Sequence, residues 1–457
     1  MKLTKKVLGV VVTALIGATA FAQKISFAQG PFNYYEAGNI ISNTRKSTFG
    51  LYYTDVDNFM SVTRWNTVKP ETFFGHIGYE DELNVGFAKQ FKDFYIGTSF
   101  VGQLDGLTST TTNNDGDKTT TTETSVENAF TAAALFGFGN MAFKATAAWN
   151  GADITNTKNV DGDVIKEENF NLNINLENGF ITKLDDKPLE MSFLLGLDSS
   201  VDKTVDETAD LKTDLSTYTI NVGSSALWTF DTKEKYTQEG LLHLYTSWAI
   251  PSYSQDIGGV KSKGFGMYNN SIALIPEYRI TLNPTERLSM KAGATLPFTF
   301  DFEGDFDYSE TDGDKIYNNL RTENVDVEIQ PMISLGMIYQ VLPEKVNFNM
   351  GIEFATPSLT WETVTTKTRT DVTSKDVDAT STTTVYNYND YVAGVIFGSG
   401  FTVQLAKTVT FDCYWIILSN IFGDDFKSGL NEGNNNFWNT VNKIFVHNIG
   451  FSISAKF

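Results

Sequence analysis

The sequence predicts an all-β chain, a transmembrane antiparallel up-and-down β-barrel of about sixteen strands, within a range of 14–18. Apolar and polar residues alternate with period two along many segments, and the last eleven residues, from His447 to Phe457, do so without a break. The connections between these segments alternate between very short and long. After the first residues, no stretch reaches the roughly 18 apolar residues that a membrane-spanning helix needs. Together these observations favour a barrel that crosses a membrane with strands.

The first 22 residues have the pattern of a secretory signal peptide. Lys2, Lys5 and Lys6 precede an apolar run over 7–16, and small residues end at Ala22. We expect cleavage before Gln23 and export of residues 23–457. Because position 23 is not Cys, the lipid-modified cysteine of a lipoprotein is not predicted there.

The C-terminal strand carries a family resemblance. Its apolar row ends in Phe451, Ile453, Ala455 and the terminal Phe457, a pattern that resembles the assembly signal of bacterial outer-membrane β-barrels of the porin-like type. The resemblance implies the outer membrane of a Gram-negative cell, with Phe451, Ile453 and Phe457 as the assembly signal. It also implies outer-membrane lipid, periplasmic chaperones and the barrel assembly machinery as partners. A homotrimer is common among sixteen-strand porins, although no residue here identifies a trimer interface.

Composition agrees with a wall that is apolar on one face only. The chain has 35 Phe and 19 Tyr, while hydrophobic residues make up an ordinary 41%. A net charge of −20 argues against nucleic acid as a partner. Cys413 is the single cysteine, so no internal disulfide is available.

The strands and the domain plan follow from the alternation. Residues 23–46 are predicted to be a periplasmic segment or a lumen plug, and residues 47–457 the barrel. Two alternatives affect the strand count: Ser47–Thr54 is a candidate extra strand, and the run from Phe74 to Phe91 is a candidate pair of strands broken near Glu80 and Asp81. The predicted strands are 59–66, 74–91, 94–104, 126–138, 141–150, 169–177, 188–198, 214–230, 238–250, 266–282, 287–302, 324–341, 346–356, 387–405, 409–419 and 443–457.

In each strand one row is apolar and the other polar, and a barrel in lipid places the apolar row outward. A soluble sandwich would invert the two rows, and alternation alone does not choose between them. The barrel assignment predicts a wet lumen, and the predicted pore-lining residues are Arg287, Lys291, Glu277, Arg279, Asp326, Glu328, Glu353, Glu177, Asn171, Asn173 and Asn175.

Three Asp-Gly-Asp triplets, at 115–117, 161–163 and 312–314, are predicted as hairpin tips, because Asp-Gly between polar strands favours a type I′ turn. The alternative is loose calcium binding. Around the second triplet, Asn159, Asp161 and Glu168 match part of an EF-hand loop, but Thr157 stands where its first Asp belongs.

Catalysis has little support in the sequence. The three histidines, His76, His243 and His447, lie in separate predicted strands, and no nucleophile elbow, metal-binding His pair or phosphate loop accompanies them. We therefore expect no enzyme activity, no cofactor and no metal site.

The function predicted from these observations is a porin, a channel for the passive diffusion of small polar solutes. The first alternative is a gated transporter of hydrophobic compounds, similar to long-chain fatty acid transporters, with residues 23–46 as its plug. The second is a surface adhesin or structural barrel, which the Thr-rich loops 108–124 and 360–384 suggest.

Overall fold

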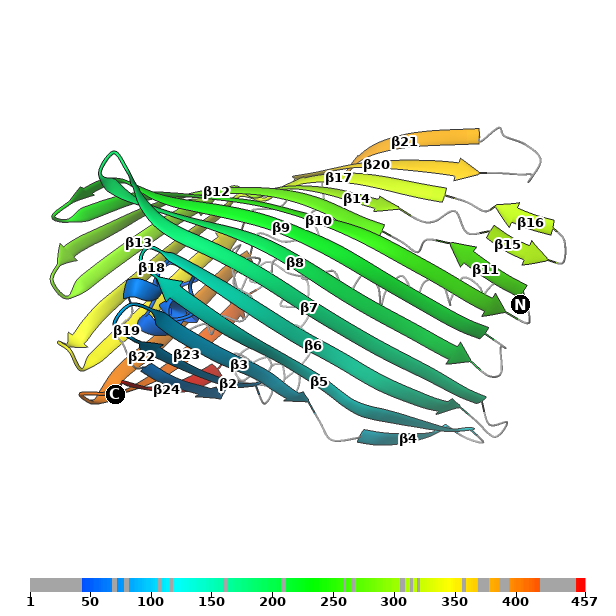
Figure 1. Cartoon of the computed structure of the whole chain (residues 1–457), viewed down its shortest axis with the longest axis horizontal. Coiled ribbons are helices and arrows are strands. Elements are labelled where there is room, and N and C mark those ends of the chain that lie inside the picture. Colours follow the sequence, from blue (N-terminus) through cyan, green and yellow to red (C-terminus); the bar gives the residue numbers. More distant parts are fainter. Residues whose placement is uncertain are drawn as a thin grey trace, which may run out of the picture.

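The architecture is a closed antiparallel β-barrel that surrounds a short helical segment (Figure 1). The computed structural model describes residues 43–67, 72–77, 82–105, 109–115, 118–158, 163–206, 211–257, 260–264, 268–304, 309–312, 315–318, 321–355, 359–368, 378–386, 394–419 and 449–456. The signal peptide prediction lies outside these residues.

The helical elements are α2 (Asn43–Ser47), α3 (Asp55–Asn58) and the 3₁₀ turn η2 (Trp65–Thr67). The described strands are β1 (Thr72–Ile77), β2 (Glu82–Gln90), β3 (Tyr95–Asp105), β4 (Ser109–Asp115), β5 (Lys118–Phe138), β6 (Met141–Lys158), β7 (Asp163–Leu184), β8 (Lys187–Asp206), β9 (Leu211–Lys233), β10 (Tyr236–Ile257), β11 (Val260–Gly264), β12 (Tyr268–Thr285), β13 (Leu288–Thr295), β14 (Phe298–Gly304), β15 (Ser309–Asp312), β16 (Lys315–Asn318), β17 (Arg321–Ile329), β18 (Met332–Leu342), β19 (Val346–Ala355), β20 (Leu359–Thr368), β21 (Asp378–Tyr386), β22 (Gly394–Ala406), β23 (Val409–Ser419) and β24 (Ile449–Lys456).

These segments build sixteen wall strands, as predicted. β13 with β14, β17 with β18, β19 with β20 and β21 with β22 are each two stretches of one wall strand, because both stretches pair with the same neighbouring wall strands. β24 pairs with β23 on one side and with β1 on the other, from Thr72 opposite Lys456 to Ile77 opposite Phe451. The C-terminal strand therefore closes the barrel. Closure removes the unpaired edges that an open sheet would expose to lipid.

The two ends of the barrel differ. Short turns such as Gly139–Asn140 and Asp185–Asp186 join the strands at one end, which we call the tight-turn end and which lies on the left in Figure 1. Both Asp185 and Asp186 have positive φ, as a two-residue hairpin turn requires. At the other end β5 to β10 continue for 18 to 23 residues. About ten residues suffice to cross a membrane, so these strands extend well beyond it.

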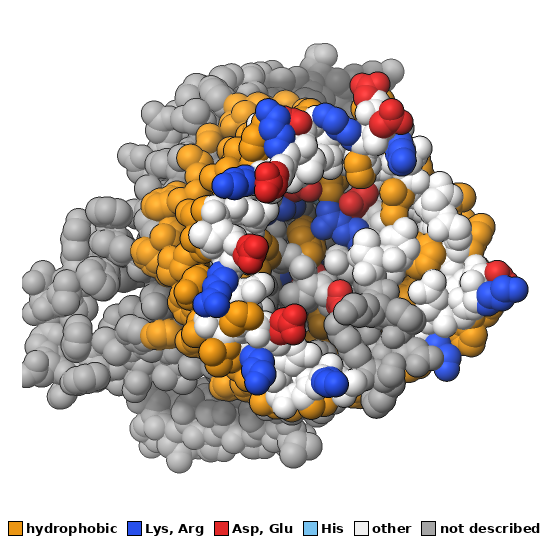
Figure 2. Space-filling view, turned by 90° about the vertical axis from the view of Figure 1, so that its left-hand side faces the viewer, with side chains coloured by type: hydrophobic (Ala, Val, Ile, Leu, Met, Phe, Trp, Pro, Cys, Tyr) orange, Lys and Arg blue, Asp and Glu red, His pale blue; other side chains and the backbone are white. Residues whose placement is uncertain are grey.

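The faces follow the barrel assignment, with the apolar row outward. On β8, Leu195 and Leu197 are 49% and 56% exposed, whereas Leu194, on the inward row, is 8% exposed. On β19, Phe354 is 40% exposed and the neighbouring Glu353 only 2%. The exposed apolar side chains form a belt on the outer face of the wall strands, and Figure 2 shows part of it. A closed barrel with this belt is an outer-membrane β-barrel, and its fold fits the outer membrane.

Aromatic side chains gather on the outer face near the tight turns. Phe91 stacks on Phe94 with ring centroids 4.6 Å apart, and Phe138 stacks on Phe143 at 6.2 Å. Such rings suit the interface between lipid and water, so they mark the level of the membrane boundary at this end.

Two strand predictions at the start of the barrel are wrong. Residues 59–66 form no strand and lie instead in the helical segment inside the barrel, and Ser47–Thr54 forms no strand either. The run 74–91 is two strands, β1 and β2, with residues 78–81 outside the described part. The strand counted at 59–66 is absent, and the run counted as one strand at 74–91 is two, so the predicted total of sixteen is nevertheless correct.

Candidate functional site

Residues 43–67, which we call the lumenal segment, lie inside the barrel near the tight-turn end (Figure 1). Its local structure is set by two short-range motifs. The Gly50 backbone N–H donates to the Arg45 carbonyl at 3.0 Å and Phe49 adopts φ +50°, which ends α2 in a Schellman-type turn. At the start of α3 the Asp57 carboxylate accepts the Thr54 backbone N–H at 2.6 Å, which caps the helix.

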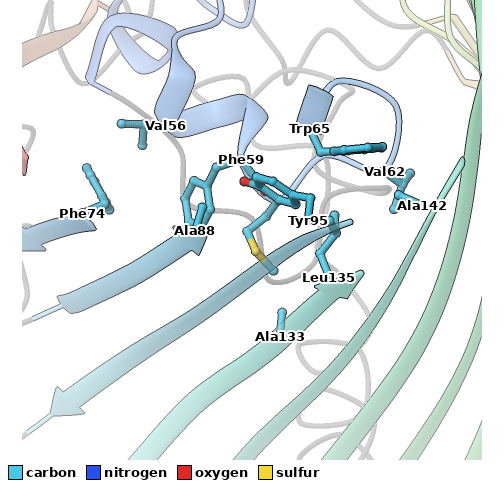
Figure 3. Close-up of a cluster of buried hydrophobic side chains, with 11 residues drawn as sticks. Val56, Phe59, Val62, Trp65, Phe74, Ala88, Tyr95, Ala133, Leu135 and Ala142 are labelled. Carbon is cyan, nitrogen blue, oxygen red and sulfur yellow. The ribbon is translucent and has the colours of Figure 1, made fainter. Parts of the chain in front are cut away.

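The second half of the lumenal segment packs on the wall through apolar side chains (Figure 3). Phe59 and Met60 are fully buried, and Trp65 lies 5.4 Å from the ring of Tyr95 on β3. The Tyr95 hydroxyl donates to the Phe59 carbonyl at 2.8 Å. The other members of this cluster are Val56, Val62, Phe74, Ala88, Ala133, Leu135 and Ala142. The inner wall is therefore apolar from β1 to β6 at this level, so polar side chains do not line the whole circumference of the lumen.

The first half of the segment is fixed to the opposite side of the wall by hydroxyl and amide groups. The Thr44 and Thr402 hydroxyls are 3.2 Å apart, and Asn349 donates to the Thr44 hydroxyl at 3.1 Å. The Tyr52 hydroxyl donates to Ser289 at 3.0 Å. Burial raises the pKa of Tyr52 against the opposing effect of the Ser289 hydrogen bond, so the phenol stays a neutral donor.

Glycines on the inner wall make room for the backbone of the segment. A Cβ on Gly398 or Gly351 would come within 2.3 Å or 2.5 Å of the Ser47 carbonyl oxygen, closer than real Cβ contacts allow. A Cβ on Gly179 would lie 2.5 Å from the Val62 carbonyl oxygen. We call the wall glycines that face the segment the glycine seat, and its members are Gly97, Gly137, Gly179, Gly293, Gly336, Gly351 and Gly398.

A stack of cations on an aromatic ring joins the two halves of the segment. The Arg45 and Arg64 guanidinium carbons lie 4.6 Å and 4.7 Å from the centre of the Tyr53 ring. The Arg279 guanidinium, from β12, lies 6.0 Å from the same centre. These contacts are close enough for cation–π attraction, so Tyr53 connects both halves of the segment with the wall.

Ion pairs continue from this stack into the wall. Arg64 Nε lies 2.8 Å from Glu190 Oε2 on β8. Desolvation lowers the pKa of Arg64, but Glu190 and Tyr53 together raise it, so the pKa is above its ordinary value. On β12 Arg279 pairs with Glu277, and Lys291 Nζ lies 2.9 Å from Glu239 Oε2. The wall strands β8, β10, β12 and β13 thus supply the acidic partners and further cations around the segment.

The predicted pore-lining residues lie in four different places. Glu277, Arg279, Lys291 and Glu353 lie beside the lumenal segment, and Glu353 accepts a hydrogen bond from Ser334 at 2.9 Å. Glu177 is buried and pairs with Lys144 Nζ at 2.6 Å. The rest lie elsewhere: Asn171, Asn173 and Asn175 on β7 and Asp326 and Glu328 on β17 lie on inward rows beyond the segment, whereas Arg287 is exposed in the tight turn before β13.

Beyond the segment, polar side chains are linked across four neighbouring strands, β7 to β10. Asn173 donates to Asp198 Oδ1, Asn175 donates to Asn173 Oδ1 at 2.6 Å, and Asn221 donates to Asp198 Oδ2 at 2.5 Å. The Tyr245 hydroxyl donates to Asn221 Oδ1 at 2.5 Å. We call these five residues the asparagine ladder. Its amide, carboxylate and phenol groups line one side of the lumen.

Figure 2 looks into the tight-turn end, where the centre is hollowed and basic and acidic side chains are visible within it. Among the described residues no group of three His, Cys, Asp or Glu side chains is placed to hold a metal ion. His243 is buried on β10, whereas the His76 side chain and His447 lie outside the described part. No helix in the described ranges is long and apolar enough to cross a membrane.

The remaining predictions on loops and termini have mixed outcomes. Asp115 pairs with Lys118 and Asp312 with Lys315, as the hairpin prediction requires, while the tips at 116–117, 159–162 and 313–314 lie outside the described residues together with the calcium alternative. Phe451 and Ile453 are 53% and 52% exposed on the lipid face of β24. Phe457 is outside the described part, and the assembly role of the three residues stays a prediction.

Sequence reasoning missed the glycine seat and most of the lumenal segment. Within the range 23–46 only Asn43 to Lys46 are described, and they belong to the segment. Two signals point to the segment: Val56, Phe59 and Met60 have the i, i+3, i+4 spacing of a helix, and Thr54 with Asp57 resembles a capping box. A glycine within a strand indicates close approach of another backbone, which is the available signal for the seat.

Comparisons with known proteins assign no function to the chain. No family model matches the chain, and no curated protein matches it. Among solved structures the chain is similar to the copper transporter OprC, with 8% identity and a TM-score of 0.36, over 76% of this chain and 66% of that one, slightly under two thirds of its length. The ferric yersiniabactin uptake receptor FyuA from Yersinia pestis shares 10% identity at a TM-score of 0.33, over 85% of this chain and 80% of that one. The FrpB iron transporter from Neisseria meningitidis shares 9% identity at 0.32, over 85% and 82%. Because these TM-scores are low, the function proposed below depends on the lumen itself.

Proposed function

We propose that this chain is an outer-membrane transport barrel that conducts small polar solutes, with the lumenal segment as a gate at the tight-turn end. The observation that carries the proposal is the position of residues 43–67, which contact the inner wall on β3 and β7 and, on the other side, on β18 and β22. A segment in contact with opposite sides of a lumen obstructs it. Conduction then requires this segment to move or to leave a side path.

The chemistry of the lumen favours polar cargo over hydrophobic compounds. Beyond the segment, the inward rows of β7 to β10 carry the asparagine ladder, and those of β12 and β14 carry Ser271 and Asp301. Such groups hydrogen-bond water and polar solutes and offer little affinity to acyl chains. The transporter of hydrophobic compounds remains the second candidate. The apolar wall residues of the cluster around Phe59 would offer it a surface only after the segment has moved away, because the segment covers them. The adhesin alternative stays a prediction without further support, although the Thr-rich ranges include the paired strands β4, β5, β20 and β21.

A reversible crosslink tests the gate. The Thr44 and Thr402 hydroxyl oxygens are 3.2 Å apart, so sulfur atoms at these positions are within reach of a disulfide. The pair Thr44→Cys and Thr402→Cys is made with Cys413→Ser, which removes the native thiol. Conductance of the purified barrel is then recorded in planar bilayers before and after reduction, and mass spectrometry measures the crosslinked fraction.

We expect stepwise conductance in the reduced protein and a marked loss after oxidation. Thr44→Cys alone in the same background is the matched control and should be insensitive to oxidation. Equal conductance in the crosslinked and reduced forms would refute the gate and favour an open porin. A silent bilayer with correctly folded protein in both states would refute the channel itself. Export by a signal peptide, assembly by periplasmic chaperones and the barrel machinery, and trimer formation remain predictions.

A further inference from the structure

The asparagine ladder has two layers with different roles. Asn175 and Asn221 are only 6% and 5% exposed, whereas Asn173, Asp198 and Tyr245 are partly exposed on the inward face of the wall. The buried pair donates to Asn173 and to Asp198, respectively, and Asn221 also accepts from Tyr245. The partly exposed groups are therefore held in place by a buried layer, which is the arrangement that preorganised binding surfaces use.

Gly196 on β8 leaves room for the side chains of Asn175 and Asn221 over this strand. It lies in register with Asn175 on β7 and with Asn221 on β9. A Cβ at position 196 would lie 2.3 Å from Asn175 Oδ1 and 3.1 Å from the Asn221 Cβ. The missing side chain lets the two amides lean over β8, so the wall presents hydrogen-bonding groups without narrowing the lumen.

We infer that the asparagine ladder is a binding surface for neutral polyhydroxylated solutes of the sugar type. Both Asp198 oxygens already accept amide N–H groups, from Asn173 and Asn221, so neutral donors occupy carboxylate positions that a bound cation would need. Amide and phenol groups both donate to and accept from hydroxyls, the Asp198 carboxylate accepts from them, and each Asn amide has a second N–H. The Tyr245 ring adds a flat apolar surface beside them, which suits the C–H face of a sugar ring. This inference deepens the proposed function, because it names the class of solute that the lumen would conduct.

Binding is measured apart from transport, so that the two proposals fail separately. The folded full-length barrel in detergent is titrated with sucrose by saturation-transfer NMR, with choline as a cationic probe and gluconate as an anionic one. The variants are Asp198→Asn, Tyr245→Phe and Gly196→Ala. Ser192→Ala is the matched control, because Ser192 contacts Ser225 at 2.5 Å between β8 and β9 but is not in the ladder. Heat-modifiable electrophoretic mobility verifies that every variant is a folded barrel.

We expect sucrose to bind the native chain in preference to both charged probes. Tyr245→Phe removes one hydrogen bond and should weaken sucrose binding about fivefold. Asp198→Asn replaces the carboxylate that accepts from Asn173 and Asn221 by an amide with only one acceptor oxygen, so binding should weaken about tenfold or more. Ser192→Ala should bind sucrose as the native chain does. Sucrose binding by a barrel that is silent in bilayers would support the ladder while refuting the channel.

Three results would overturn the inference. If choline binds and sucrose does not, the lumen recognises cations, and Asp301 and Asp326, which face each other between β14 and β17, become the better explanation. If no probe binds a correctly folded barrel, the ladder only ties β7 to β10 together. If sucrose binds equally to Asp198→Asn, Tyr245→Phe and Gly196→Ala, its site is elsewhere.

Discussion

Arg64 Nε lies 2.8 Å from Glu190 Oε2, and this contact ties the lumenal segment to β8. Both side chains are about one-fifth exposed, so the pair is partly shielded from water. The Arg64 guanidinium carbon also lies 4.7 Å from the centre of the Tyr53 ring. One side chain thus combines an ion pair to the wall with a cation–π contact inside the segment, and its loss should release the segment.

Arg64→Met and Glu190→Gln should each loosen the segment by about 1.5–3 kcal/mol, because each leaves a partly buried charge without its partner. The readout is maleimide labelling of Thr48→Cys in the Cys413→Ser background. Labelling should accelerate at least tenfold. The exchange Arg64→Glu with Glu190→Arg restores the ion pair but not the cation–π contact with Tyr53, so labelling should be slower than in the single variants. A double variant that labels as fast as the single ones would show that the ion pair does not hold the segment.

Gly398→Ala should displace the start of the segment, because the new Cβ would meet the Ser47 carbonyl oxygen at 2.3 Å. Backbone atoms cannot yield as a flexible side chain does, so the expected result is higher conductance with a barrel that remains folded. Gly75→Ala on β1 is the control, because the nearest atom to its Cβ is a Phe73 ring carbon at 3.9 Å. Native-like conductance in Gly398→Ala would mean that the segment shifts without opening the lumen.

Phe59→Ala should weaken the docking of the second half of the segment by about 3–5 kcal/mol, since Phe59 is 1% exposed and a cavity would replace its ring. The fluorescence of Trp65 near Tyr95 should shift to the red as water reaches this cluster. Phe73→Ala, on the lipid face of β1 and 44% exposed, removes the same side chain outside the cluster and should leave the spectrum unchanged.

The Tyr52 contact should fail at high pH. Its pKa is raised by burial above the ordinary value of 10.0, so the unfolded or undocked chain ionises first. The stabilisation is fully present below pH 10 and is lost as the pH rises from there through the raised pKa. Labelling of Thr48→Cys should therefore become faster above about pH 10. Tyr52→Phe should remove this part of the pH dependence; an identical pH profile in the variant would exclude Tyr52 as its source.

The wall was predictable from the sequence because period-two alternation fixes which residues share a face, and lipid decides which face is outward. Leu195 and Leu197 on β8 and the closing strand with Phe451 follow this rule. Residues 59–66 of the lumenal segment were wrongly predicted as a strand. Their apolar residues have mixed spacing, and residues buried inside a barrel need not alternate as those of a wall strand do. The asparagine ladder was predicted only through Asn173 and Asn175. Its partners Asp198, Asn221 and Tyr245 lie on other strands. Which residues stand opposite each other depends on how neighbouring strands are aligned, and the pattern within one strand does not give that alignment.

The glycine seat makes the segment and the wall a matched pair. Ser47, Val62 and Trp65 each lie where an alanine on the wall would collide with them. A chimera that carries residues 43–67 in another sixteen-strand barrel would therefore be blocked at several wall positions at once, and an inhibitor peptide copied from this segment would be selective for this barrel. Such a chimera should fold only if the glycine seat is introduced into the new barrel together with the segment.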